Sequence, residues 1–169
     1  MLKEVLEQAI AQKRLVAIKC DPADLGTFCL GYIHSTTDDL YVIEEIDSEG
    51  RHGGFHIGKH RDIVELGYGS EYENAFSVAI DGKFPSEFPL PGIVHSFDDV
   101  LEWSQHNQTV IRMKNTSYVS TTGIVQAFDD DWIKFTEYKN FGKPDGTTLS
   151  TREFLYRIYF CEPSVFFAR

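Results

Sequence analysis

The second half of the chain repeats the pattern of its first half. When the 169-residue sequence is laid on itself with a shift of 92 positions (123 − 31 = 92), glycines, turn acids and apolar residues fall in register without a gap. Chance seldom aligns three residue classes over one continuous stretch, so the match predicts that one structural unit occurs twice. The matched pairs include Gly31 and Gly123, Asp39 and Asp131, Glu45 and Glu137, Gly54 and Gly146, Ile63 and Leu155, and Leu66 and Ile158.

Nearer the start of each unit the shift becomes 95 positions (111 − 16 = 95), which places Val16 with Ile111. The extra residues of the first unit fall in the segment 21–26, and length changes are typical of surface loops. Residues 84–92 contain three prolines, which favour an extended linker. The predicted organisation is a first unit at 1–80, a proline-rich linker at 81–95 and a second unit at 96–169.

Each unit is predicted to begin with a short helix. In the first unit, apolar residues from Leu2 to Ile10 recur at helical spacing. In the second, Ser96 precedes an apolar run and Asp99 follows three positions later, which is a capping-box signal. Alternating apolar residues then predict five strands in each unit, with short connections that favour antiparallel pairing. The predicted strands are 15–20, 27–35, 39–47, 53–58 and 61–67 in the first unit, and 109–115, 118–127, 131–139, 146–151 and 153–160 in the second.

Two glycines in the predicted strands bear on the shape of the sheet. Gly31 and Gly123 lie in the middle of the second strand of their units, where glycine permits a sharp bend. A strongly bent sheet of five strands hides its edges by closing on itself. The predicted fold class is therefore mainly β with short helices, arranged as two tandem β-barrels. Within residues 72–80, Phe76, Val78 and Ile80 alternate with other residues and are compatible with a further strand.

The order of these motifs resembles the Sm-like family of small β-barrels. The resemblance rests on the glycine-centred segment 28–33, the acidic turn at 38–39 and the closing segment 55–66, and it extends over roughly 5–67 and 100–160. It implies two tandem Sm-like barrels, each with an N-terminal helix and about five bent antiparallel strands. Members of the family pair the fourth strand of one barrel with the fifth strand of the next, so the resemblance implies association of barrels within or between chains. RNA binding through the Sm-like surface is the second function that it implies.

The segment 51–61 combines histidines with cationic residues. His52, His56 and His60 recur at four-residue spacing, and strand residues four apart share a face. Because imidazoles are common metal ligands, these three are candidate metal ligands. The alternative is an exposed, partly basic hairpin that binds an anion or RNA and holds no metal. The ligand or anion-binding candidates are Arg51, His52, His56, Lys59, His60 and Arg61.

Aromatic residues of the second unit are candidate contact residues. An apolar C-terminal tail on a small barrel needs a cover, which packing on the linker or on a second subunit supplies. The interface candidates are Trp132, Tyr159, Phe160, Phe166 and Phe167.

Glu45 and Glu137 occupy matched positions near the end of the third strand. No nucleophile motif accompanies them, so we expect these glutamates to act as hydrogen-bond partners rather than as a catalytic pair.

Charge and cysteine content narrow the function classes. The chain carries 26 acidic and 16 basic residues, a net charge of −10. This disfavours RNA and argues against DNA as a partner, because Lys and Arg must neutralise phosphates. Cys20, Cys29 and Cys161 have neither the spacing of a disulfide framework nor a CxxC zinc pair. Cys20 and Cys29 are expected on adjacent strands, close together and as thiols.

No nucleotide-binding, metalloprotease or hydrolase motif occurs, so we predict that the chain is not an enzyme and uses no cofactor. A signal-peptide pattern and a membrane-length apolar run are also absent from the sequence, so a cytoplasmic location is expected. The predicted function is a non-catalytic binding or assembly module that acts through contacts with a protein partner or a second copy. RNA binding, and metal binding at His52, His56 and His60, are the alternatives.

Overall fold

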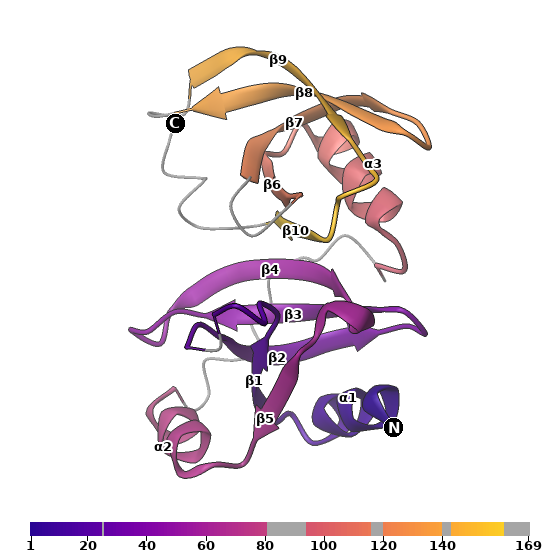
Figure 1. Ribbon diagram of the computed structural model, residues 1–169. Helices are drawn as coiled ribbons and strands as arrows, with labels where there is room; N and C mark the ends of the chain where they lie inside the picture. Colours follow the sequence, from indigo (N-terminus) through magenta and orange to yellow (C-terminus); the bar gives the residue numbers. More distant parts are fainter. Residues whose placement is uncertain (25, 81–93, 116–119, 140–142, 161–169) are drawn as a thin grey trace. The chain divides into compact units, whose positions relative to one another are not determined.

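The chain forms two compact units, Met1–His95 and Ser96–Arg169. The computed structural model describes residues 1–24, 26–80, 94–115, 120–139 and 143–160 (Figure 1). Most of the predicted linker, at 81–93, lies outside the described residues. No helix in the described part of the chain has the length and apolar character needed to cross a membrane.

The first unit contains five antiparallel strands in the order β5-β1-β2-β3-β4. Short connections join β1 to β4 as successive neighbours, and β5 returns to pair with β1. Each predicted strand of this unit is present, with bounds shifted by at most four residues. The elements are α1 (Leu2–Ala11), β1 (Leu15–Lys19), β2 (Cys29–Thr36), β3 (Leu40–Ile46), β4 (His52–Lys59), the 3-10 helix η1 (His60–Asp62), β5 (Glu65–Tyr68) and α2 (Glu71–Ala79).

The two helices of the first unit cover opposite faces of its sheet (Figure 1). Residues at alternate positions along each strand point to opposite faces, and the two sets form separate apolar clusters. We call these the α1 face and the α2 face. The α1 face buries Leu6 and Ala9 against Val16, Ile18, Ile33, Tyr41 and Ile43, and the α2 face buries Ile80 against Leu15, Leu30, Tyr32 and Ile46.

The segment 72–80, which the sequence left compatible with a further strand, instead lies in helix α2 up to Ala79, with Ile80 as the C-cap residue. The Ser70 side chain accepts a hydrogen bond from the Glu73 backbone N–H, and the Glu73 carboxylate accepts one from the Ser70 backbone N–H. This capping box satisfies two N–H groups that a helix start leaves without partners. Phe76, Val78 and Ile80 alternate as in a strand, but Phe76 and Ile80 are also four residues apart. In a helix these two therefore lie on one side, and both pack against the α2 face.

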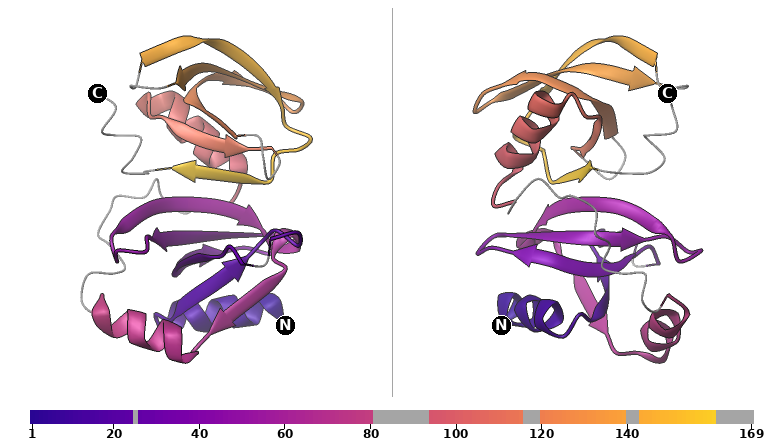
Figure 2. Two further views of the ribbon diagram at one scale, coloured as in Figure 1. Left: turned by 60° about the vertical axis from the view of Figure 1, so that its left-hand side comes forward. Right: turned by 180° about the vertical axis from the view of Figure 1, so that it is seen from behind.

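The second unit has the same antiparallel strand order, β10-β6-β7-β8-β9. Its helix α3 begins with the predicted capping box of Ser96 and Asp99. Figure 2 shows the strands arching over this helix, and the Ser104 hydroxyl accepts a hydrogen bond from the backbone N–H of Val125 on β7. The elements are α3 (Phe97–Asn107), β6 (Ile111–Lys114), β7 (Ser120–Phe128), β8 (Trp132–Lys139), β9 (Lys143–Thr151) and β10 (Arg157–Phe160).

Residues matched by the 92-residue shift occupy equivalent pairing positions in the two sheets. Gly31 pairs with Glu45, as Gly123 pairs with Glu137, and each second strand carries a bulge three residues further on. A Cβ at Gly31 would lie 2.1 Å from the Glu44 backbone oxygen, and one at Gly123 would lie 2.3 Å from that of Thr136. Both sheets therefore bring backbone so close to the second strand that only glycine fits.

The predicted mainly β fold with short helices is confirmed, and all pairings given for the two units are antiparallel. Within the described residues of the first unit, β5 pairs with β1 and β4 with β3. This pairing describes an open order of five strands in each unit.

Candidate functional site

The histidines of the 51–61 hairpin do not share one face of the sheet. In β4, His56 pairs with Ile43 of the α1 face, whereas His52 pairs with Ile46 of the α2 face. The reason is a register shift between Glu45 and Ile46, where the two glycines before Phe55 add a residue to β4. The four-residue spacing therefore does not bring His52 to His56.

His60 lies beyond the end of β4, in η1. Its Nε2 is 2.9 Å from the Thr36 hydroxyl oxygen, and its ring stacks on Tyr41 with centroids 6.4 Å apart. His56 contacts the same tyrosine edge-on, with centroids 5.5 Å apart. His56 and His60 are thus neighbours of Tyr41, but the three histidines do not form a ligand group among the described residues.

The cations of the hairpin lie beside acidic residues. Arg51 forms ion pairs with Asp47 at 2.8 Å and Glu49 at 2.9 Å, and Arg61 lies 3.9 Å from Asp62. Burial lowers the pKa of Lys59, and the neighbouring Arg61 acts in the same direction. The charges of Arg51 and Arg61 are therefore locally compensated, which weakens the interpretation of this segment as a basic surface for an anion or RNA.

A chain of polar contacts runs through the α1 face of the first unit. The Cys20 thiol is 3.5 Å from the Tyr41 hydroxyl oxygen, which is 3.3 Å from Nε2 of His56. Nδ1 of the same imidazole is 2.5 Å from Oε1 of Glu45, and the Cys29 thiol donates to that oxygen at 3.2 Å. Five side chains thus form one connected cluster, which we call the Cys–Glu–His cluster. They come from β2, β3 and β4 and from Cys20, the residue that follows β1.

Packing fixes the central members of the Cys–Glu–His cluster. Tyr41 is 1 % exposed and His56 is fully buried. The tyrosine ring fits because the facing residue on β4 is Gly58, where a Cβ would come within 2.7 Å of the Tyr41 hydroxyl. The Glu45 side chain keeps 22 % exposure, so the cluster reaches solvent beside this carboxylate.

Cys29, Glu45 and His56 bring three different ligand atoms together. Their sulfur, oxygen and nitrogen atoms all lie within 4.8 Å of one another. In the described part of the chain this is the one group of three or more His, Cys, Asp and Glu side chains with that property. Sequence reasoning placed Cys20 and Cys29 on adjacent strands but assigned the cluster no role, because the link to Glu45 depends on the register of β2, β3 and β4.

Glu137 of the second unit occupies the position of Glu45 but has different neighbours. Thr148, which pairs with Phe135 as His56 pairs with Ile43, donates from its hydroxyl to Glu137 at 2.7 Å. Thr121 occupies the position of Cys29, paired with Met113. The expectation that both glutamates act as hydrogen-bond partners therefore fits the contacts that the structure gives them.

The α2 face carries a second polar group around Glu44, which is fully buried. Nδ1 of His52 is 3.6 Å from its carboxylate. Burial lowers the pKa of His34, which the charge of Glu44 partly offsets. A pocket of about 200 Å³ adjoins this group and is lined by Ile10, Lys13, Tyr32, Ile33, His34 and Glu44.

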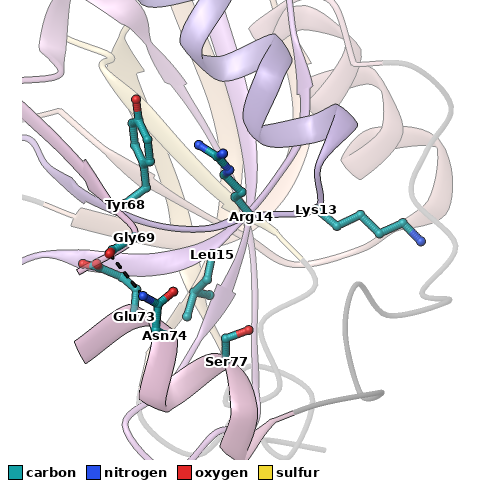
Figure 3. A pocket seen from close by; sticks show the side chains of 8 residues that line it. All are labelled: Lys13, Arg14, Leu15, Tyr68, Gly69, Glu73, Asn74 and Ser77. Atoms are coloured by element: carbon teal, nitrogen blue, oxygen red, sulfur yellow. Dashed lines mark hydrogen bonds between the residues drawn. The ribbon is translucent and has the colours of Figure 1, made fainter. Parts of the chain in front are cut away.

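A larger pocket of about 400 Å³ lies between the end of α1, β5 and α2 (Figure 3). The Arg14 guanidinium sits 5.3 Å above the Tyr68 ring, and Lys13 points away from the other labelled side chains. Asn74 donates to the Gly69 carbonyl, and the Glu73 carboxylate is used by the capping box. The polar groups of this pocket mainly serve the local fold, so we place the candidate site at the Cys–Glu–His cluster.

The aromatic interface candidates fall into three groups. Trp132 is 46 % exposed at the start of β8. Tyr159 and Phe160 are buried, with Tyr159 under the Arg112 guanidinium at 4.5 Å and Phe160 against the ring of Trp103. Phe166 and Phe167 lie outside the described residues.

No protein-family model, curated protein or solved structure matches this chain. Its candidate site is therefore interpreted from the geometry of its own residues.

Proposed function

We propose that this protein is a non-catalytic assembly module of two Sm-like units, which associates with further copies of itself by pairing strand edges. The observation that carries the proposal is the position of β9 and β5. Among the described residues, β9 pairs only with β8 and β5 only with β1. Each therefore presents a row of backbone N–H and C=O groups to a further strand.

These two edges are also the pair that the Sm-like resemblance selects. β9 is the fourth strand of the second unit, and β5 is the fifth strand of the first unit. In the family, a fourth strand pairs with the fifth strand of the next barrel. Pairing of β9 with β5 of another chain is a heterologous contact, which produces rings when it closes and filaments when it does not.

The composition of β9 restricts pairing to its second half. Lys143, Pro144 and Asp145 occupy its first half, and charges and proline are the usual protection of a strand edge. Residues 147–151 carry no charge. Leu149 is 59 % exposed there and pairs with Lys134 of β8, and the exposed Trp132 of β8 pairs with Thr151 at the end of the same stretch. This five-residue stretch is close in length to the four residues of β5.

Light scattering on the full chain over a range of concentrations tests the proposal. We expect wild-type protein to assemble, and Leu149→Lys and Tyr68→Lys each to give monomers, because each places a charge at one of the two edges. A mixture of the two variants keeps one intact β9 and one intact β5, so it should form dimers and nothing larger.

The control is Val78→Lys, which makes the same kind of change at an exposed helical residue away from both edges. It should assemble like the wild type. A wild-type chain that stays monomeric at all concentrations, or Lys variants that assemble normally, would refute the proposal.

A further inference from the structure

We propose that Cys29, Glu45 and His56 bind one divalent transition-metal ion of the Zn²⁺ class, with a fourth coordination position open to solvent. The inference is independent of the proposed assembly. It differs from the site of His52, His56 and His60 that the sequence offered as an alternative, since of those three residues it uses only His56.

The donor set suits this class of ion. Zinc prefers thiolate, imidazole and carboxylate ligands, and sites with three protein ligands leave the fourth position to water or another ligand. A thiolate and a carboxylate supply two negative charges, which balance a divalent cation in a partly buried place. The sulfur, oxygen and nitrogen atoms already lie within 4.8 Å of one another.

The present contacts show where the ion goes. Oε1 of Glu45 faces both the Cys29 thiol and Nδ1 of His56, at 3.2 and 2.5 Å. Zinc–ligand bonds of about 2.0–2.3 Å separate neighbouring ligand atoms by about 3.5 Å, so a small rotation of Glu45 makes room. The ion replaces the hydrogens in these contacts, the thiol proton passes to solvent, and the imidazole hydrogen lies on Nε2.

Tyr41 is placed to orient the imidazole ligand. Its hydroxyl oxygen is 3.3 Å from Nε2 of His56, the nitrogen that faces away from Glu45. Histidine ligands usually donate their second N–H to such a group, which fixes the ring and its tautomer. Tyr41 is itself held in place by burial and by the close approach of Gly58.

The ion has a route from solvent. His56 is fully buried, but Cys29 is partly buried and the Glu45 side chain retains 22 % exposure. The open coordination position therefore lies on the Glu45 side of the cluster. An entry path of this kind distinguishes an exchangeable metal site from a polar group sealed in the core.

The sheet itself does not require a thiol and an imidazole here. In the second unit the same backbone positions hold Thr121 and Thr148, and the Thr148 hydroxyl donates to Glu137 at 2.7 Å. The first unit thus has a thiol and an imidazole where its structural counterpart has two threonines. This difference separates the metal site from a merely structural hydrogen-bond cluster.

The test uses full-length protein with Cys20→Ser and Cys161→Ser, so that Cys29 is the remaining thiol. The stripped protein is titrated with Co²⁺ and then Zn²⁺. We expect one ion per chain, a sulfur-to-cobalt charge-transfer band in the near ultraviolet, and displacement of Co²⁺ by Zn²⁺.

Variants at the site and matched controls make the result decisive. Cys29→Ser and His56→Gln should each weaken Zn²⁺ binding by more than about 100-fold, and Tyr41→Phe by about 10-fold, the range of outer-sphere effects. His52→Gln, His60→Gln and Glu137→Gln should bind like the parent. Circular dichroism establishes that each variant is folded, and Cys29→Ser decides the question if His56→Gln is not.

Three results would overturn the inference. The first is a stripped parent that binds neither ion below millimolar concentration. The second is binding that Cys29→Ser leaves unchanged. The third is loss of binding in His52→Gln or His60→Gln with retention in Cys29→Ser, which would favour the histidine-only site.

Discussion

Glu45 and Glu137 occupy the same position in two sheets of the same strand order, yet their neighbours differ. Glu45 accepts from a thiol and contacts a buried imidazole, whereas Glu137 accepts from the Thr148 hydroxyl. Features that both units share, such as the paired glycines, follow from the fold. We expect a specific function to depend on features that only one of the two units has.

The two units can be monitored separately in unfolding experiments. Both tryptophans, Trp103 and Trp132, belong to the second unit. Tryptophan fluorescence in urea therefore reports on the second unit, and hydrogen exchange of amides in β1 to β5 reports on the first. Matched changes in the two units can therefore be compared within one chain.

The largest loss of stability is expected from substitutions at the paired glycines, Gly31 and Gly123. Gly31→Ala and Gly123→Ala each place a Cβ within 2.3 Å of a backbone oxygen, so each should destabilise its own unit by about 3 kcal/mol or more. Gly67→Ala is the control, because its Cβ would meet nothing closer than 3.9 Å. If one unit tolerates the change, the two bends are not equivalent.

The next largest loss of stability should differ between the two matched glutamates. Glu45→Ala removes the oxygen that Cys29 and His56 share, and should cost about 2–3 kcal/mol in the first unit. Glu137→Ala removes the acceptor of Thr148 and should cost about 1 kcal/mol in the second. The loss of stability in the first unit is measured by hydrogen exchange and that in the second unit by tryptophan fluorescence in urea. Equal losses in the two units would show that the thiol and imidazole contacts add nothing to stability.

A smaller loss of stability, similar in the two units, is expected at the matched strand pairs Tyr41–Gly58 and Ile133–Ser150. In the first unit the Tyr41 hydroxyl approaches Gly58, while in the second Ser150 accepts from Asn115 at 2.6 Å. Tyr41→Phe and Ser150→Ala each delete one hydroxyl and should each cost about 1 kcal/mol. A loss above about 3 kcal/mol for either hydroxyl would mean that it supports more than this contact.

The smallest effect concerns pH. Burial holds the pKa of His34 below 6.5 in the folded chain, so the unfolded chain binds this proton more readily. Stability is therefore complete above pH 6.5 and falls as the pH drops below that value, by less than about 1 kcal/mol at this half-exposed residue. Gln126 holds the matched position, and His34→Gln should reduce the pH slope of exchange in β1 to β5. An unchanged slope would contradict the prediction.

The sequence predicted elements well where a local signal was strong. The apolar faces of α1 and the capping box of α3 depend on residues three and four positions apart, and both helices are present. The secondary structure of segment 72–80 could not be predicted from its apolar residues, because their spacing suits both a strand and a helix. The deciding signal was Ser70 with Glu73, a capping box of the same kind as Ser96 with Asp99.

The candidate site was predicted less well, for a physical reason. Four-residue spacing relates His52 to His56 only in a regular strand, and the register shift opposite Glu45 moves His52 to the other face. The partners of His56 are Glu45 and Tyr41, on a different strand, and Cys29 joins through Glu45. Such contacts join residues 11 to 16 positions apart in sequence.

By itself, the sequence determined the order of the first helix and the five strands in each unit, and the one position in each second strand, Gly31 or Gly123, that must be glycine. These follow from short-range periodicity and from the absence of a Cβ in glycine, which need no knowledge of distant residues. Only the tertiary structure decided which side chains meet at Glu45 and Glu137. Strand register and bulges set that choice, and one added residue in β4 turns a side chain to the opposite face.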